Sequence, residues 1–166
     1  AQVHVGPFYI MQSGEDIDIP NVVTSVLASY RGFDTFGEVV VVFTAVIGVL
    51  ALLEFSRKDN QVGERPAPMF QHKILRIVSK ILIPPIMLFA LYVQFHGEYG
   101  PGGGFQAGVI FASSIILYAM LFGIEQTRKA VSMPVVKILA ALGVLIYGSV
   151  GIVSMLSCGN YLNYSV

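Results

Sequence analysis

The sequence has a single cysteine, no tryptophan and few charged residues. The one cysteine, Cys158, excludes an internal disulfide and a cysteine-based metal cluster, and it is most simply a small apolar residue near a helix end. Only 12% of the 166 residues are charged, about half the share of a soluble domain. Ten basic residues are balanced by ten acidic ones, so nothing would neutralise a row of phosphates and no nucleic-acid partner is expected.

Apolar residues are abundant: they make up 55% of the chain, and the mean hydropathy is +0.72. A chain of this composition has lipid as its natural solvent. The first of its long apolar runs would span ~30 Å as a helix, which is the thickness of a bilayer core. Strands would leave open sheet edges in hydrocarbon, which are not tolerated. We therefore predict an all-α polytopic membrane protein with about four transmembrane helices, at residues 36–55, 74–95, 104–123 and 135–157.

The remaining segments are polar and divide the chain. Residues 20–30 predict a short amphipathic or partly buried helix that begins at Pro20, and the acidic, turn-rich stretch SGEDIDIP before it predicts a loop outside the lipid. The predicted domains are an N-terminal part with the first transmembrane helix, a polar cytoplasmic linker, and a part with three transmembrane helices. Their residues are 1–55, 56–72 and 73–166.

The distribution of basic residues predicts the topology. Of the ten, six lie in or beside the loop after the first apolar run, and three lie in or beside the loop after the third. By the positive-inside rule both loops are cytoplasmic, in a multi-pass protein of the cell's inner membrane. The N-terminal segment, the C-terminus and the glycine-rich loop before residue 104 then face outward. Lys80, about one turn inside the lipid, is expected to snorkel back to the interface.

The glycine-rich loop, HGEYGPGGGFQAG at residues 96–108, contains a dinucleotide-binding pattern at Gly102, Gly104 and Ala107. That fingerprint requires a preceding strand, whereas a membrane helix is expected here. A phosphate-binding P-loop is excluded as well, because no Lys-Ser or Lys-Thr pair follows the glycines. We therefore expect no bound nucleotide.

The same loop has two other interpretations. Pro101 ends the preceding segment, Gly102 and Gly103 permit tight backbone packing, and Phe105 starts the next helix. Gly104 and Gly108, spaced as G-x-x-x-G, offer a face against which another helix could pack. The loop is then a tight outer hairpin with a packing surface. In the alternative, the loop additionally lines an ion entrance with the side chains of two ionisable residues, His96 and Glu98.

Arg31, Asp34 and Glu38 are the ionisable residues where the first apolar run begins. Glu38 is followed at once by apolar residues, and a carboxylate inside such a run is a functional candidate because leaving it charged in lipid costs a few kcal/mol. A structural alternative is a capping box, in which Thr35 and Glu38 would satisfy the free amides of a helix start. In the functional interpretation Asp34 and Glu38 belong to an ion or proton pathway, and Arg31 holds or tunes the two carboxylates. In the structural alternative Arg31 and Asp34 form only a clasp, or Asp34 caps the helix.

The motif FHGEYGPGGGFQAG, followed by an apolar helix, resembles the signature of the B subunit (MnhB family) of Mrp-type multisubunit sodium/proton antiporters. The resemblance covers roughly residues 72–157, and a similar domain occurs in membrane-bound hydrogenases. Two positions depart from it, Glu98 in place of a frequent second histidine and Ala107 in place of a frequent glycine. The family also has a further helix after residue 157, and the chain begins at Ala1 rather than methionine, so we expect residues to be missing at the termini.

A second resemblance covers residues 20–55. NVVTSVLASYRGFDTFGEVVVV is similar to the C-terminal extension of the Mrp A subunit, and to the small hydrogenase subunit that corresponds to it. The chain would then join two pieces that are separate proteins elsewhere.

The two resemblances imply a transporter subunit rather than an enzyme, with Na⁺ and H⁺ as transported ions. Its partners would be other membrane subunits of a hetero-oligomeric complex and the lipid bilayer. No catalytic residue, metal site or cofactor is expected in this chain. Two alternatives stay open: the same module in a redox-driven ion pump such as a membrane-bound hydrogenase, whose redox chemistry would lie in partner subunits, and a purely structural membrane scaffold.

Overall fold

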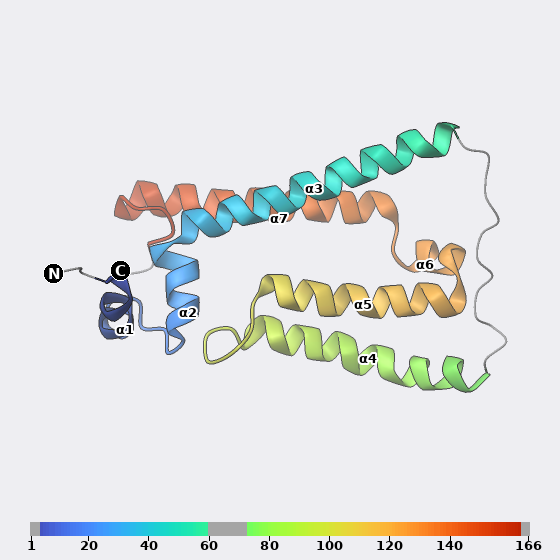
Figure 1. Ribbon diagram of the computed structural model, residues 1–166, viewed down its shortest axis with the longest axis horizontal. Coiled ribbons are helices and arrows are strands. Elements are labelled where there is room, and N and C mark those ends of the chain that lie inside the picture. The colour runs from blue at the N-terminus through green and yellow to red at the C-terminus, as the bar shows by residue number, and fades with distance from the viewer. Residues whose placement is uncertain (1–3, 60–72, 164–166) are drawn as a thin grey trace. The chain divides into compact units, whose positions relative to one another are not determined.

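The computed structural model describes residues 4–59 and 73–163, and every regular element in these ranges is helical (Figure 1). Four of the helices are long and apolar enough to cross a membrane, as predicted, and the chain is a multi-pass membrane protein. In chain order the elements are α1 (Val5–Asp16), α2 (Val22–Ser25), the π-helix η1 (Val26–Tyr30), α3 (Gly32–Asp59), α4 (Lys73–Phe95), α5 (Gly104–Phe122), α6 (Ile124–Ala130) and α7 (Met133–Cys158).

The transmembrane helices agree with the predicted runs to within a few residues at each end. The first one begins earlier, at Gly32, and α3 continues to Asp59, four residues beyond the predicted helix end. The rest of the predicted linker, residues 60–72, lies outside the described residues. The short helix α6, between α5 and α7, was not predicted.

The prediction of a loop at SGEDIDIP is wrong for the first half of that stretch, because α1 extends through Asp16. Only residues 17–21 form the connection to the next helix. Two aromatic residues of α1 explain why a helix is stable there. Phe8 and Tyr9 pack against Tyr30, with ring centroids 6.2 and 4.9 Å from its ring. This tertiary contact between segments more than 20 residues apart has no local sequence signal.

The predicted short helix at residues 20–30 exists, but it has two parts. Asn21 rather than Pro20 sets its start, because the Asn21 side chain accepts a hydrogen bond from the Val23 amide at 3.1 Å. The second part is π-helical, with the Arg31 amide bonded to the Val26 carbonyl at 2.7 Å. Single π-helical turns of this kind frequently mark functional sites.

Two compact units make up the fold: residues 1–63 with 137–166, and residues 64–136. In the first unit, α3 and α7 meet through Phe36, whose ring stacks on Tyr147 with centroids 6.0 Å apart. The same ring lies 3.3 Å from the position that a Cβ atom on Gly148 would take. The segment after α7 folds back onto the start of α3, where Leu162 is buried against Gly32.

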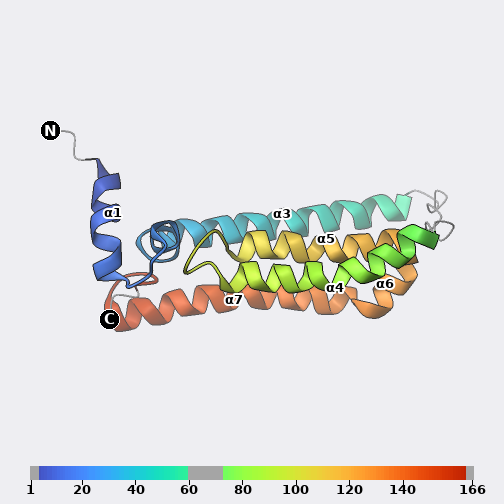
Figure 2. The same cartoon turned by 90° about the horizontal axis from the view of Figure 1, so that it is seen from below.

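The second unit is built on the α4–α5 hairpin, whose helices lie side by side in both views (Figures 1 and 2). The side chains buried in this hairpin are mostly small, which lets the two backbones approach closely. They are Ser79, Ala90, Val93, Ala107, Ser114 and Leu121. Pro84 and Pro85 lie inside α4, which continues through both.

Candidate functional site

The predicted ionisable group lies at the start of α3. Arg31 Nε donates a hydrogen bond to Asp34 Oδ2 at 2.7 Å, and Arg31 Nη2 lies 2.5 Å from the same oxygen. Both side chains are more than half exposed, so the ion pair stabilises the fold by no more than ~1 kcal/mol. The pair is a local clasp across the first turn of α3.

The capping box considered for Thr35 and Glu38 does not form. The Thr35 amide donates to the Arg31 carbonyl at 3.3 Å, so it is not a free group for Glu38 to satisfy. The Thr35 hydroxyl instead donates to the Leu27 carbonyl at 2.8 Å, at the junction between the π-helix and α3. The physical reason is that α3 begins at Gly32, which places Thr35 inside the helix rather than at its cap.

Glu38 lies in the interior of α3, about 9 Å along the axis from Gly32. It points about 200° around the helix from Phe36, the residue that contacts α7. Its side chain is exposed, and among residues 4–59 and 73–163 no hydrogen bond or ion pair to it is present. Glu38 is therefore not joined to the Arg31–Asp34 clasp.

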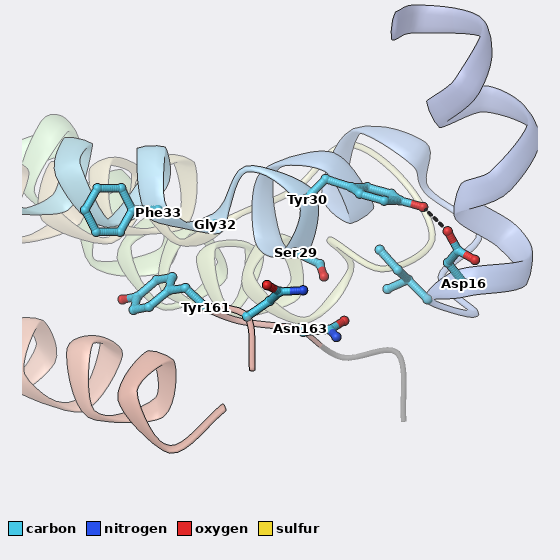
Figure 3. Close-up of a pocket in the computed structure, with 9 residues that line it drawn as sticks. Asp16, Ser29, Tyr30, Gly32, Phe33, Tyr161 and Asn163 are labelled. Carbon is cyan, nitrogen blue, oxygen red and sulfur yellow. Dashed lines mark hydrogen bonds between the residues drawn. The ribbon is translucent and has the colours of Figure 1, made fainter. Parts of the chain in front are cut away.

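A polar cavity of about 450 Å³ lies at the same end of α3, and sequence reasoning missed it (Figure 3). Its lining comes from the end of α1, the π-helix, the start of α3 and the segment after α7. The residues are Asp16, Ile17, Ser29, Tyr30, Gly32, Phe33, Asn160, Tyr161 and Asn163. No local pattern connects Asp16 with residues 160–163, because they are brought together only by the return of the chain after α7.

The strongest polar contact in this cavity joins Tyr30 and Asp16, whose hydroxyl and Oδ2 atoms lie 2.7 Å apart, with the tyrosine donating. Burial raises the pKa of Tyr30 to about 12, and the hydrogen bond to Asp16, the charge of Asp16 and that of Tyr9 act in the same direction. Tyr30 therefore stays protonated at physiological pH, and its hydroxyl keeps donating to the Asp16 carboxylate.

The segment after α7 is held over the cavity by one serine and one glycine. Ser154 Oγ accepts from the Asn163 amide at 2.9 Å and donates to the carbonyls of Asn160 and Asn163, both at 3.2 Å. The ring of Tyr161 lies directly against Gly151, where a Cβ atom would overlap it. The asparagine carbonyls and amides thus stay at the cavity wall.

The glycine-rich loop belongs to the other unit. Gly102 lies so close to the end of α4 that a Cβ atom there would be 2.5 Å from the Val93 carbonyl oxygen and 2.9 Å from the Gly97 amide nitrogen. Gly103, with φ of 144°, is the residue before α5. A side chain at Gly108 would meet open space, so its predicted packing face is not covered by the described residues.

The two ionisable residues of this loop differ in their surroundings. The half-buried ring of His96 stacks on Tyr92 with centroids 4.9 Å apart, and its Nε2 atom lies close to Gly100. Glu98 is exposed, as are Pro101 and Phe105. Across the described residues no group of three or more histidine, cysteine, aspartate or glutamate side chains is arranged to hold a metal ion.

Residues 74–166 match the family described as "Domain related to MnhB subunit of Na+/H+ antiporter". The chain belongs to this MnhB-related family. Residues 1–68 match a second family, MbhE, which is the E subunit of MBH. Both resemblances predicted from the sequence are thereby confirmed, whereas the predicted domain boundaries stay a prediction.

Relatives of this MnhB-related chain occur in two kinds of assembly. A Staphylococcus aureus (strain Newman) chain classed as antiporter subunit mnhB2 is 36% identical over 83 residues, which cover 49% of this chain and 57% of that one. A chain of an archaeal respiratory complex, the membrane-bound sulfane sulfur reductase, is 31% identical with a TM-score of 0.79, over 97% of this chain and 66% of that one. A chain of the Mrp complex from Dietzia sp. DQ12-45-1b is 29% identical with a TM-score of 0.78, over 98% of this chain and 19% of that one. The MnhB-related chain thus spans less than two thirds of each of these relatives.

Proposed function

We propose that the chain is a membrane subunit of a multisubunit Mrp-type antiporter that exchanges sodium ions for protons. In this proposal the chain supplies part of an ion pathway and packing surfaces for neighbouring subunits, and it is not itself an enzyme. Na⁺ and H⁺ are the transported ions, and no cofactor is held in the chain. The proposal is supported by the MnhB-related family match and by the likeness to a chain of the Mrp complex.

The observation that carries a transport role is the position of Glu38. A carboxylate in the interior of a membrane-spanning helix is costly to keep charged unless a partner, water or a transported cation meets it. The structure gives Glu38 no such partner among the described residues, and the side chain points away from Phe36 and α7. We propose that Glu38 exchanges protons or cations at a surface that a neighbouring subunit covers in the complex.

The surroundings of Glu38 supply polar groups at the same end of α3. Gly32 and Phe33, in its first turn, line the cavity that contains Asp16 and the asparagines after α7. Together with the Arg31–Asp34 clasp, these groups would give an ion a polar approach to the helix end. His96 and Glu98 are proposed to line a second outward-facing entrance beside the glycine-rich loop, whose outward orientation follows from the positive-inside rule.

The test is Glu38→Gln in the assembled complex, reconstituted in vesicles that carry a sodium or pH gradient. The substitution keeps the size and removes the charge, so we expect the rate of gradient-driven exchange to fall about 10-fold or more while assembly is unchanged. Glu54→Gln, the same change near the other end of α3, is the matched control and should retain the rate. Full exchange by the Glu38→Gln complex at several pH values would show that Glu38 is outside the pathway.

The second candidate is the same module in a redox-driven ion pump. It is favoured by the match of residues 1–68 to the MbhE family and by the likeness to the archaeal respiratory complex. Extraction in a gentle detergent, followed by mass spectrometry of the bound proteins, separates the two. Recovery with antiporter subunits and without redox proteins supports the antiporter, whereas recovery with iron–sulfur subunits supports the redox pump. A scaffold without an ion pathway predicts that Glu38→Gln leaves exchange intact.

A further inference from the structure

A second cavity, of about 420 Å³, lies in the other unit where α4 begins and α5 ends. Its lining comes from α4, α5 and α6, and is formed by Arg76, Lys80, Ile83, Pro84, Tyr118, Phe122 and Gln126. Among these lining residues two are cationic and none is acidic. The transport role proposed above does not use any of them.

Three of the lining residues, Arg76, Lys80 and Pro84, are spaced by four and follow one face of α4. Tyr118 and Phe122, also spaced by four, follow one face of α5, whereas Gln126 comes from α6, after the helix break at Gly123. Because α4 and α5 are antiparallel, the beginning of α4 lies beside the end of α5. Polar groups lie at the end of the hairpin, and the lining becomes apolar toward its middle.

Phe122 holds both cationic groups at the cavity. The Arg76 guanidinium carbon and the Lys80 ammonium nitrogen each lie 5.5 Å from the centroid of its ring. A cation–π contact of this kind positions a cation. Phe122 thus holds a guanidinium and an ammonium group where both can contact one anion.

The depth of the cavity matches a membrane interface. Arg76 and Lys80 lie about 4.5 and 10.5 Å along the axis from Lys73, the first residue of a helix that is apolar enough to cross the membrane. A lipid whose phosphate contacts Arg76 and Lys80 would have its acyl chains further along α4, beside the exposed apolar surface of that helix. Pro84 has no amide hydrogen, so it also deprives the Lys80 carbonyl of its helical partner and leaves an acceptor for a headgroup hydroxyl.

We propose that this cavity is a binding site for the phosphate headgroup of an anionic phospholipid. Arg76 and Lys80 bind the phosphate, Gln126 and the Lys80 carbonyl bind polar headgroup atoms, and Ile83 and Pro84 contact the start of an acyl chain. Basic pockets between membrane helices bind lipid headgroups by this combination of charge and depth. The proposal is independent of the ion pathway around Glu38.

The experiment is native mass spectrometry of the full chain in detergent with an equal mixture of phosphatidylglycerol and phosphatidylcholine. We expect the chain to retain phosphatidylglycerol preferentially, and Arg76→Gln with Lys80→Gln to lower its apparent affinity about 10-fold. Arg128→Gln with Lys129→Gln is the matched control, because it removes the same charge from the last turn of α6, outside the cavity. Arg76→Lys with Lys80→Arg should retain the lipid, which separates charge from misfolding.

Three results would overturn the proposal. Equal retention of phosphatidylcholine would show that the headgroup charge is not recognised. An equal loss of affinity in the control variant would show that the attraction comes from the basic surface as a whole. Displacement of phosphatidylglycerol by about 10 mM inorganic phosphate would show a site for a free anion instead of a lipid.

Discussion

The α4–α5 hairpin and the α3–α7 pair are held together by different parts of the chain. In the hairpin the backbones themselves approach, over small buried residues and through Gly102, which lies against the end of α4. Between α3 and α7 the contact is made by side chains: the Phe36 ring of α3 stacks on Tyr147 of α7 and also contacts Tyr161 in the segment after α7. The backbone contact of the hairpin is therefore sensitive to added atoms, whereas the aromatic contact that Phe36 makes between α3 and α7 is sensitive to removed ones.

This difference bears on function. In the most apolar stretch of α3 no residue is buried within the chain. In the corresponding stretch of α5, 22% of the residues are buried. A helix that contacts its own chain mainly near one end leaves most of its length for other subunits. Glu38 lies near the end that makes these contacts, but it is exposed on the opposite face of α3 from Phe36, where a neighbouring subunit could complete an ion pathway.

Among the substitutions that test this difference, Gly102→Ala is expected to lower the free energy of unfolding the most. The added Cβ atom would meet the Val93 carbonyl and the Gly97 backbone, and backbone atoms cannot rotate away as a side chain can. We expect the free energy of unfolding, measured by SDS titration, to fall by about 2–3 kcal/mol. Gly108→Ala is the control, since its Cβ atom would enter open space on α5 and should be neutral or slightly stabilising. Equal stability of the two variants would show that the loop does not need its close approach.

A smaller effect is expected when Phe36→Ala removes the side-chain contact of α3 with α7. The ring is half-buried and stacks on Tyr147 with an interplanar angle of 8°, so the loss of this pair and of the buried apolar area should cost about 1–2 kcal/mol in the same titration. Phe33→Leu, which keeps an apolar side chain at an exposed position three residues earlier in α3, is expected to cost less. A double-mutant cycle with Tyr147→Leu isolates the energy of the Phe36–Tyr147 pair. A coupling energy of zero would show that the aromatic contact does not stabilise the fold.

The comparison also explains what the sequence could predict. Long apolar runs and the glycine-rich loop are local patterns, so the four membrane-spanning helices followed from composition and length. The beginning of α3 was misplaced because the pattern at Thr35 and Glu38 is that of a helix cap. What decides the start is Gly32, packed under Leu162 from the far end of the chain. Such a contact leaves no local trace in the sequence.

The candidate sites divide in the same way. Arg31, Asp34 and Glu38 could be selected because they are charges beside an apolar run, and their roles in transport stay predictions. The cavity around Asp16 could not be selected, because its walls come from segments more than 100 residues apart. The cation pair on Phe122 was equally hidden, since Lys80 alone is explained by a side chain that snorkels to the interface.

The smallest effect is expected at another side-chain contact of the first unit, the hydrogen bond between Tyr30 and Asp16. Because the pKa of Tyr30 is raised from 10.0 to about 12, its contribution to stability is complete below about pH 10 and is lost as the pH rises through about 12. Asp16→Asn removes the carboxylate charge and leaves a neutral amide oxygen as a weaker acceptor, so the pKa of Tyr30 should fall toward 10 but stay above it, since burial remains. Ultraviolet titration of tyrosinate measures this shift, with Tyr30→Phe identifying the signal among the eight tyrosines.

Asp18→Asn is the matched control for this titration. It removes the same charge two residues away, at a position whose φ of 55° asparagine accepts readily. It should leave the titration of Tyr30 unchanged, because the hydrogen bond of Tyr30 is to Asp16. If Asp16→Asn leaves the titration unchanged as well, Asp16 does not contribute to the raised pKa, which then comes from burial and from Tyr9. The cavity would then be held together by its aromatic and asparagine walls, without the Tyr30–Asp16 bond.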